Sequence, residues 1–191
     1  MNPTSTNLPG VLIFEPRVFR DDRGFFVETW NRDRYAGAGL PSEFVQDNLS
    51  ESAPGVLRGL HYQHPNGQGK LVSVTRGSVF DVAVDIRVGS TTFGRWVGVG
   101  LSAENGWQLY IPPGFAHGFV VSGDGRATFQ YKCTAPYDPA SEGSVAWDDP
   151  DLGINWPVAA PTLNAKDRDA PRLRDVPDDR LPRYEVATTT G

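Results

Sequence analysis

The sequence has very little cysteine and no long apolar run. Cys133 is the single cysteine among 191 residues, so no internal disulfide can form, which favours a reducing compartment. We expect Cys133 to be a small buried side chain on a strand. No apolar run approaches the roughly 20 residues of a membrane helix, and the N-terminal residues lack the basic and apolar segments of a secretory signal. The sequence therefore predicts a soluble, cytoplasmic protein without a membrane partner.

An excess of basic residues is also absent. The 18 Lys and Arg residues against 23 Asp and Glu residues give a net charge of −5. Proteins that coat nucleic acid or bind membrane surfaces need the opposite balance, so we expect no nucleic-acid partner either. A small ligand that bears phosphate is still compatible, because a local cluster of Arg and Lys can oppose the overall charge.

Long stretches of helical periodicity are missing as well, whereas glycine and proline are abundant and regularly spaced. This profile is typical of many short strands joined by turns. A closed barrel or a jelly roll leaves few strand edges exposed, so we expect a single all-β domain over residues 1–191. The expected strands are Val11–Phe14, Gly24–Trp30, Phe44–Asn48, Val56–Tyr62, Leu71–Arg76, Ser78–Arg87, Phe93–Leu101, Gln108–Ile111, His117–Val121 and Ala127–Thr134.

Helices are expected at only two places. A short helix over Asn31–Ala38 is closed by glycines, and a helical turn is expected around Ala165–Asp169. From about Pro150 the composition changes to Asp, Pro, Arg and Ala without strand periodicity. We expect this region, an irregular tail from about residue 171, to pack on the barrel rather than form a second domain.

Two expected strands show a period-two alternation, which assigns their faces. In Ser78–Arg87 we expect one face in a core, with Phe80, Val82, Val84 and Ile86, and one polar face, with Val79, Asp81, Ala83 and Asp85. In the earlier strand, one face carries Leu57, Gly59 and His61, and the other carries Arg58, Leu60 and Tyr62.

The chain has three histidines, His61, His64 and His117. A histidine in the mouth of a barrel suits proton transfer, because its ordinary pKa of about 6.5 lies close to working pH. A hydrogen-bonded core histidine is the structural alternative for His61, and we expect His64 in a loop or at the rim. His117 ends a Pro-x-Gly-x-x-His pattern that resembles the second signature motif of cupins, in which a turn delivers a histidine into the barrel.

A metal site is the obvious suspicion for such a protein, since many cupins bind one with His-x-His, a nearby Glu and a later His. Here the first cluster reads His-x-x-His, so on a strand the rings of His61 and His64 face opposite sides. Residues 62–70 contain no carboxylate. A metal site needs at least three ligands that converge, and no more than two of the three histidines are expected on one face. We therefore expect no functional metal.

Seven segments, in order, resemble the dTDP-4-dehydrorhamnose 3,5-epimerase family, which makes the dTDP-L-rhamnose precursor from dTDP-4-keto-6-deoxyglucose. No segment is decisive alone, but the ordered set is specific and covers nearly the whole chain up to about Pro171. The resemblance implies a cupin-type jelly-roll β-barrel with short peripheral helices. The segments are Phe14–Pro16, Asp22–Phe26, Val45–Asn48, Gly55–Gln63, Val79–Arg87, Gly114–Phe119 and Asn164–Asp167.

The resemblance implies proton chemistry beside a ketone. In the substrate C3 and C5 flank the C4 ketone, so loss of either proton gives an enolate, and epimerisation needs groups on opposite faces of the ring. His61 would be the base, and Asp167 would orient and stabilise its imidazolium. Tyr131 would protonate the opposite face, and Lys70 would stabilise the enolate charge at the C4 oxygen. No redox cofactor or metal would be required.

These catalytic assignments have structural alternatives. Asp167 would serve equally in the first turn of a short helix capped by Asn164. Tyr131 would fit a packed core, Lys70 a solvated edge strand and Arg58 the surface. Each alternative is the more usual reading of one residue alone, and the joint match to one mechanism favours the catalytic roles.

The resemblance also implies a substrate-binding set. Arg23 and Arg58 would hold the diphosphate with their guanidinium forks. The family is homodimeric, and Arg23 and Glu28 would reach the neighbouring subunit's site. Other matching positions are Phe26, Gln46, Asn48, His117, Tyr137, Glu142 and Lys166; Phe26 and Tyr137 would otherwise be core aromatics.

Three other functions stay open from the sequence. The first is an epimerase that inverts one carbon of a related dTDP-keto-deoxysugar in secondary metabolism, since such enzymes keep the same His–Asp pair. The second is a metal-dependent cupin enzyme such as an oxygenase, against which the missing metal ligands argue. The third is a non-catalytic sugar-binding cupin, which would have no use for a matched acid and base.

Overall fold

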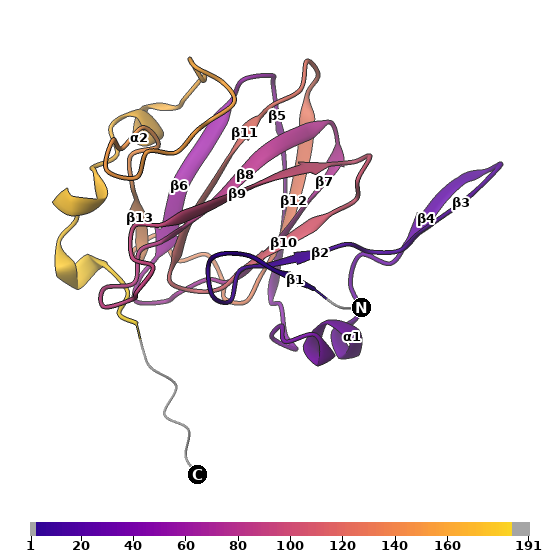
Figure 1. Ribbon diagram of the computed structural model, residues 1–191, viewed down its shortest axis with the longest axis horizontal. Coiled ribbons are helices and arrows are strands. Elements are labelled where there is room, and N and C mark those ends of the chain that lie inside the picture. The colour runs from indigo at the N-terminus through magenta and orange to yellow at the C-terminus, as the bar shows by residue number, and fades with distance from the viewer. Residues whose placement is uncertain (1–2, 185–191) are drawn as a thin grey trace, which may run out of the picture.

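The computed structural model describes residues 3–184, which form two antiparallel β-sheets and a separate hairpin (Figure 1). Among these residues no helix is both long enough and apolar enough to cross a bilayer. The larger sheet contains, in spatial order, β1 (Thr4–Ser5), β2 (Leu12–Phe14), β10 (Gln108–Ile111), β7 (Lys70–Arg76), β12 (Ala127–Cys133) and β5 (Gln46–Ser52). The second sheet contains β13 (Glu142–Ser144), β6 (Leu57–Gln63), β11 (Phe115–Val121), β8 (Ser78–Asp85) and β9 (Trp96–Ser102).

The main hydrophobic core lies between the two sheets. Side chains from both sheets alternate into it, because neighbouring residues of a strand point to opposite faces. Phe119 of β11 stacks on Phe129 of β12 with ring centroids 4.1 Å apart, so the core joins one sheet to the other. This architecture is the cupin-type jelly roll expected from the sequence.

The outer face of the five-stranded sheet is covered by the C-terminal part of the chain. Leu152, Leu173 and Leu181 pack there against alternate residues of β6 and β8. The segment includes α2 (Ala165–Arg168), which lies beside β6 in Figure 1, and the 3₁₀ helices Leu173–Asp175 and Asp178–Arg180. The expectation of a tail packed on the barrel is confirmed up to residue 184; residues 185–191 lie outside the described part.

This cover corrects the expected polar face of β8. The face that carries Val82 and Val84 lies under the C-terminal segment, and the face that carries Asp81 and Asp85 points into the barrel. Both carboxylates have no exposed surface. Because each face of the strand is packed against another layer, the two aspartates need internal partners rather than water.

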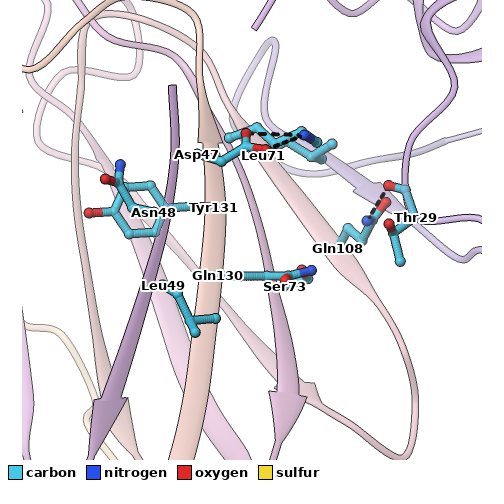
Figure 2. Close-up of a pocket in the computed structure, with 10 residues that line it drawn as sticks. Thr29, Asp47, Asn48, Leu49, Leu71, Ser73, Gln108, Gln130 and Tyr131 are labelled. Atoms are coloured by element: carbon cyan, nitrogen blue, oxygen red, sulfur yellow. Dashed lines mark hydrogen bonds and ion pairs between the residues drawn. The ribbon is translucent and has the colours of Figure 1, made fainter. Parts of the chain in front are cut away.

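The outer face of the six-stranded sheet is covered only in part. The short helix α1 (Arg32–Gly37) begins at Asn31, whose side chain accepts a hydrogen bond from the Arg34 N–H, and buries Tyr35 against this face. Next to it lies an open groove of about 310 Å³. Figure 2 shows Gln108 and Thr29 at one side of this groove and Tyr131 at the other.

The hairpin formed by β3 (Val18–Asp21) and β4 (Gly24–Val27) projects away from the barrel (Figure 1). Its turn contains Gly24 at φ +128°, a conformation that favours glycine. Phe25 is 64% exposed and Phe26 is 68% exposed. The hairpin therefore carries apolar surface that nothing in residues 3–184 of the same chain covers.

Candidate active site

The strand β6 carries a bulge that brings two charged side chains to the same face. His117 of β11 pairs with His61, whereas Phe119 pairs with Arg58, so two residues of β6 stand opposite Gly118. The strand alternation expected from the sequence is thereby broken, and Arg58 lines the same cavity as His61. The expected placement of Arg58 on the opposite face is wrong for this reason.

Glycine is required where the bulge meets β11. Gly59 has φ +133°, and a Cβ atom on it would lie 2.5 Å from the Cα of Gly118. A Cβ on Gly118 would in turn lie 2.7 Å from the carbonyl oxygen of Arg58. The two glycines thus allow the close backbone approach that sets the direction of His61.

His61 is paired with a buried carboxylate. Its Nε2 atom lies 2.6 Å from Asp167 Oδ1, and the second oxygen of Asp167 accepts the N–H of Gly59 at 3.2 Å. The His61 side chain is 30% exposed, whereas that of Asp167 is 0% exposed. When Nε2–H donates to this carboxylate, the other ring nitrogen of His61 is left as the acceptor for a substrate proton.

Asp167 meets both of the structural expectations that the sequence left open, a place in a capped helical turn and a contact with His61. It lies in the first turn of α2, where its N–H donates to Asn164 Oδ1 at 2.7 Å, so the helix is capped as expected. Burial raises the pKa of Asp167, but His61, the Gly59 N–H and Lys166 outweigh it, and the pKa lies below its ordinary value. The capping turn therefore presents an ionised carboxylate to His61.

The cavity around His61 has a volume of about 200 Å³. Its polar and aromatic walls come from both sheets and from α2. The lining residues are Ser50, Arg58, His61, Lys70, His117, Phe119, Phe129, Tyr131, Asn164 and Asp167. Six of the residues expected in the site thus meet in one place, although they are up to 109 positions apart in the sequence.

Lys70 and Tyr131 face this cavity from neighbouring strands. Lys70 lies on β7 between β10 and β12, so it is not the edge-strand charge of the structural alternative. Burial lowers the pKa of Lys70, opposed by negative groups that include Asp81. Burial raises the pKa of Tyr131, an effect that the charge of Arg58 opposes. Tyr131 therefore holds its phenolic proton at neutral pH, as a proton donor must.

Arg58 is held in place by β5. Its Nε–H donates to Ser52 Oγ at 2.9 Å, and its Nη2 donates to the Glu51 carbonyl at 3.4 Å. Ser52 is buried. The remaining guanidinium donors of Arg58 stay available at the cavity, where they suit a phosphate or carboxylate ligand.

A second group of expected residues forms a hydrogen-bonded rim. Lys166 forms an ion pair with Glu142 at 2.5 Å, and the Tyr137 hydroxyl donates to the same carboxylate at 3.0 Å. The N–H of Tyr137 donates to Gln46 Oε1 at 2.8 Å, and the Gln46 amide donates to Asn48 at 3.0 Å. These five residues therefore form one network beside α2, and Tyr137 is exposed rather than part of a core.

Three expected binding residues lie elsewhere. Arg23, Phe26 and Glu28 belong to the hairpin or its base, and none of them lines the cavity around His61. Arg23 is bound to Asp21 of the same hairpin, and Glu28 lies 3.0 Å from Arg34 of α1. Within one chain the structure does not bring these residues to the other candidates.

Sequence reasoning missed Asp81, which contacts a residue of the cavity wall. Its two carboxylate oxygens lie 2.9 and 3.1 Å from Nε2 of His117, and His117 lines the cavity. The sequence carries a signal, an aspartate in a largely apolar strand, but the alternation predicts only a polar face there. A carboxylate buried between two sheets is a functional signal. The burial can be recognised only when the position of the second sheet is known.

His64 is separated from this site. It follows the end of β6 and lines a different cavity, of about 680 Å³, together with Arg87, Pro113 and residues of the C-terminal segment. In residues 3–184 no group of three or more His, Cys, Asp or Glu side chains is arranged to hold a metal ion.

Comparison with known proteins adds a family and its ligands. Residues 5–175 match the family described as dTDP-4-dehydrorhamnose 3,5-epimerase. A dTDP-4-dehydrorhamnose 3,5-epimerase of Pseudomonas aeruginosa is 55% identical over 177 residues, which cover 92% of this chain and 97% of that protein.

Two solved structures are similar over nearly their whole length. A dTDP-6-deoxy-D-glucose-3,5-epimerase of Legionella pneumophila in complex with dTDP-4-keto-L-rhamnose has a TM-score of 0.93 and 51% identity, covering 97% of this chain and 99% of the other. A 3′-monoepimerase of Streptomyces bikiniensis in complex with dTDP-quinovose has a TM-score of 0.87 and 38% identity, covering 96% and 93%.

Proposed function

The chain belongs to the dTDP-4-dehydrorhamnose 3,5-epimerase family, and from that membership we propose that it inverts C3 and C5 of dTDP-4-keto-6-deoxy-D-glucose with His61 as base. The enzyme is an isomerase that acts on dTDP-sugars. The single observation that carries the proposed mechanism is the contact of His61 with the buried carboxylate of Asp167 at 2.6 Å, in a cavity that also holds Lys70 and Tyr131.

The proposed reaction begins with removal of a proton next to the C4 ketone. The free ring nitrogen of His61 takes the proton from C3 or C5, and the electron pair of the C–H bond moves to the C4 oxygen as an enolate. Asp167 stabilises the imidazolium that forms. The cation of Lys70 stabilises the enolate oxygen, which is the position where charge develops.

Inversion is completed when a proton returns to the other face of the ring. The Tyr131 hydroxyl donates this proton to carbon, while the C4 oxygen gives its electron pair back to the ketone. Two groups on different strands, β6 and β12, support a site that approaches the ring from two sides. The chemistry balances without a redox partner, because the substrate and the product are isomers.

Deuterium incorporation tests this proposal directly. The purified protein is incubated with dTDP-4-keto-6-deoxyglucose in D₂O, and the sugar is followed by NMR. We expect deuterium at both C3 and C5, because each carbon loses a proton to a group that exchanges with solvent. Absence of label at both carbons would overturn the proposed substrate.

A single-centre epimerase is the second candidate. The specific observation in its favour is the TM-score of 0.87 with a 3′-monoepimerase. In the same experiment, label confined to one carbon would assign this chain to that activity, while leaving the role of His61 intact. A cytoplasmic location, the absence of a cofactor and a single domain over residues 1–191 stay predictions.

We further propose a homodimer in which each hairpin completes the partner's site. Support comes from the exposed Phe26, from the projection of its hairpin away from the barrel (Figure 1), and from the absence of Arg23 among the residues that line the cavity it is expected to serve. A second copy of the chain could pack against the six-stranded sheet, where Leu49 is an exposed apolar side chain and the open groove beside it is lined mainly by polar residues.

Mixing two inactive variants tests this arrangement. One variant carries Arg23→Ala with Phe26→Ala, and the other carries His61→Ala. Random pairing in a one-to-one coexpression gives half heterodimers, each with one intact site of two, so about a quarter of wild-type activity should return. Separately tagged subunits allow the heterodimer to be isolated. A heterodimer as inactive as both parents would show that each hairpin serves its own subunit.

A further inference from the structure

Asp81 is a fully buried carboxylate whose described hydrogen bonds go to one partner. Both of its oxygens lie within hydrogen-bond distance of His117 Nε2, and no backbone N–H or hydroxyl in residues 3–184 donates to it. The contrast with Asp85 on the same face of β8 is clear. Asp85 accepts hydrogen bonds from Arg87, Ser90 and Thr92, so its charge is satisfied within a structural network.

Lys70 is the opposite case, a cation without a bound anion. It lines the cavity beside His117, and no ion pair or hydrogen bond of its ammonium group occurs among the described residues. Titratable groups reach it from five strands. They are Asp81 (β8), His117 (β11), His61 (β6), Tyr131 and Cys133 (β12) and Glu142 (β13).

We propose that Asp81 is a positioning residue that supplies the buried negative charge needed to keep Lys70 cationic beside the substrate's C4 oxygen. The inference rests on the proposed function and deepens it. An ammonium group in a cavity of a protein core tends to lose its proton, and a lysine without charge cannot stabilise an enolate. A fixed carboxylate behind His117, which lines the same cavity as Lys70, opposes that loss without touching the substrate.

The electrostatic coupling is reciprocal. Burial lowers the pKa of Lys70, whereas the charges of Cys133, Asp81 and Glu142 raise it. Burial raises the pKa of Asp81 above its ordinary value, and His117 and Lys70 oppose this rise. Since each charge favours the other by the same free energy, removal of Asp81 makes the proton of Lys70 easier to lose. Cys133 and Glu142 are present in both the wild type and an Asp81 variant, so a difference in the pKa of Lys70 between the two proteins would come from Asp81.

The test uses the small number of lysines. The chain has only Lys70, Lys132 and Lys166, so reductive ¹³C-methylation gives three lysine NMR signals, besides that of the N-terminal amine, and each can be titrated separately. In D81N we expect the Lys70 midpoint to fall by about 1 to 3 pH units. Lys132 and Lys166 should not move, and they serve as internal references in the same sample.

Asp85→Asn is the matched control, since it removes an equally buried carboxylate from the same strand face. It should lower the midpoint of urea unfolding but leave the Lys70 titration in place. In D81N the alkaline limb of the pH profile for deuterium exchange should shift down together with Lys70, and activity should recover as the pH falls. A purely structural role would lower activity at all pH values.

Two results would overturn the inference. One is a Lys70 titration that is the same in D81N and the wild type. The other, measurable even if D81N does not fold, is a wild-type Lys70 that already titrates below neutral pH. Both differ from failure of the proposed function, which would be seen as no deuterium exchange by the wild-type protein.

Discussion

Replacement of His61 by asparagine is expected to reduce deuterium exchange and epimerisation by about 10²- to 10⁴-fold, the usual contribution of a positioned acid or base. Asparagine can still donate a hydrogen bond to the buried Asp167, so the carboxylate keeps a partner. It cannot take a proton from carbon. Because the first step of the reaction is lost, exchange and product formation should fall together, as measured by NMR in D₂O.

The histidine three positions further along provides the control for this variant. His64 lies at a different cavity, so His64→Asn should exchange at a rate close to wild type. Urea unfolding of both variants checks that neither result reflects loss of the fold. A His61→Asn protein that exchanges at the wild-type rate would remove His61 from the role of base.

Replacement of Tyr131 by phenylalanine is expected to separate the two halves of the reaction. The ring that packs near Phe129 is retained, with centroids 5.9 Å apart in the native protein, and only the hydroxyl is lost. His61 can still remove and return a proton on its own face, so deuterium exchange should persist. Inverted product should fall by about 10²-fold or more, because no acid remains on the opposite face.

Tyr110→Phe is the matched control for the loss of one buried hydroxyl. Tyr110 lies in the cluster around α1 on the outer face of the six-stranded sheet, and burial raises its pKa to about 12. It should leave both exchange and inversion unchanged. If Tyr131→Phe lowers exchange and inversion equally, Tyr131 acts before the proton is returned, and the assignment of the acid has to move to another group.

Much of the barrel could be predicted from the sequence because alternation and turn residues mark strands directly. The expected strand Gln108–Ile111 agrees with the structure, and β12 ends one residue earlier than expected, at Cys133. Short or irregular strands were missed. Val18–Asp21 spans four residues that are mostly exposed, and Glu142–Ser144 spans only three, so neither is long enough to show a hydrophobic pattern.

The candidate site was harder to predict because its geometry depends on packing between layers. The sequence identified His61 and Asp167 through a family resemblance, but local pattern alone favoured a helix-capping role for Asp167. The bulge that turns Arg58 into the cavity depends on contact between Gly59 and Gly118 of the neighbouring strand. The sequence of a single strand gives no sign of that contact. It also gives no sign of the second sheet that buries Asp81.

The position of Asp167 late in the chain also affects when a newly made protein becomes able to catalyse proton transfer. Its turn belongs to the C-terminal segment that covers the five-stranded sheet, so it leaves the ribosome after every strand of both sheets has been synthesised. The strands can pair before this segment arrives, since chains fold progressively from the N-terminal side during synthesis. A nascent barrel would then hold His61 without its carboxylate, and docking of the last-made segment would convert an inert binding cavity into a proton-transfer site.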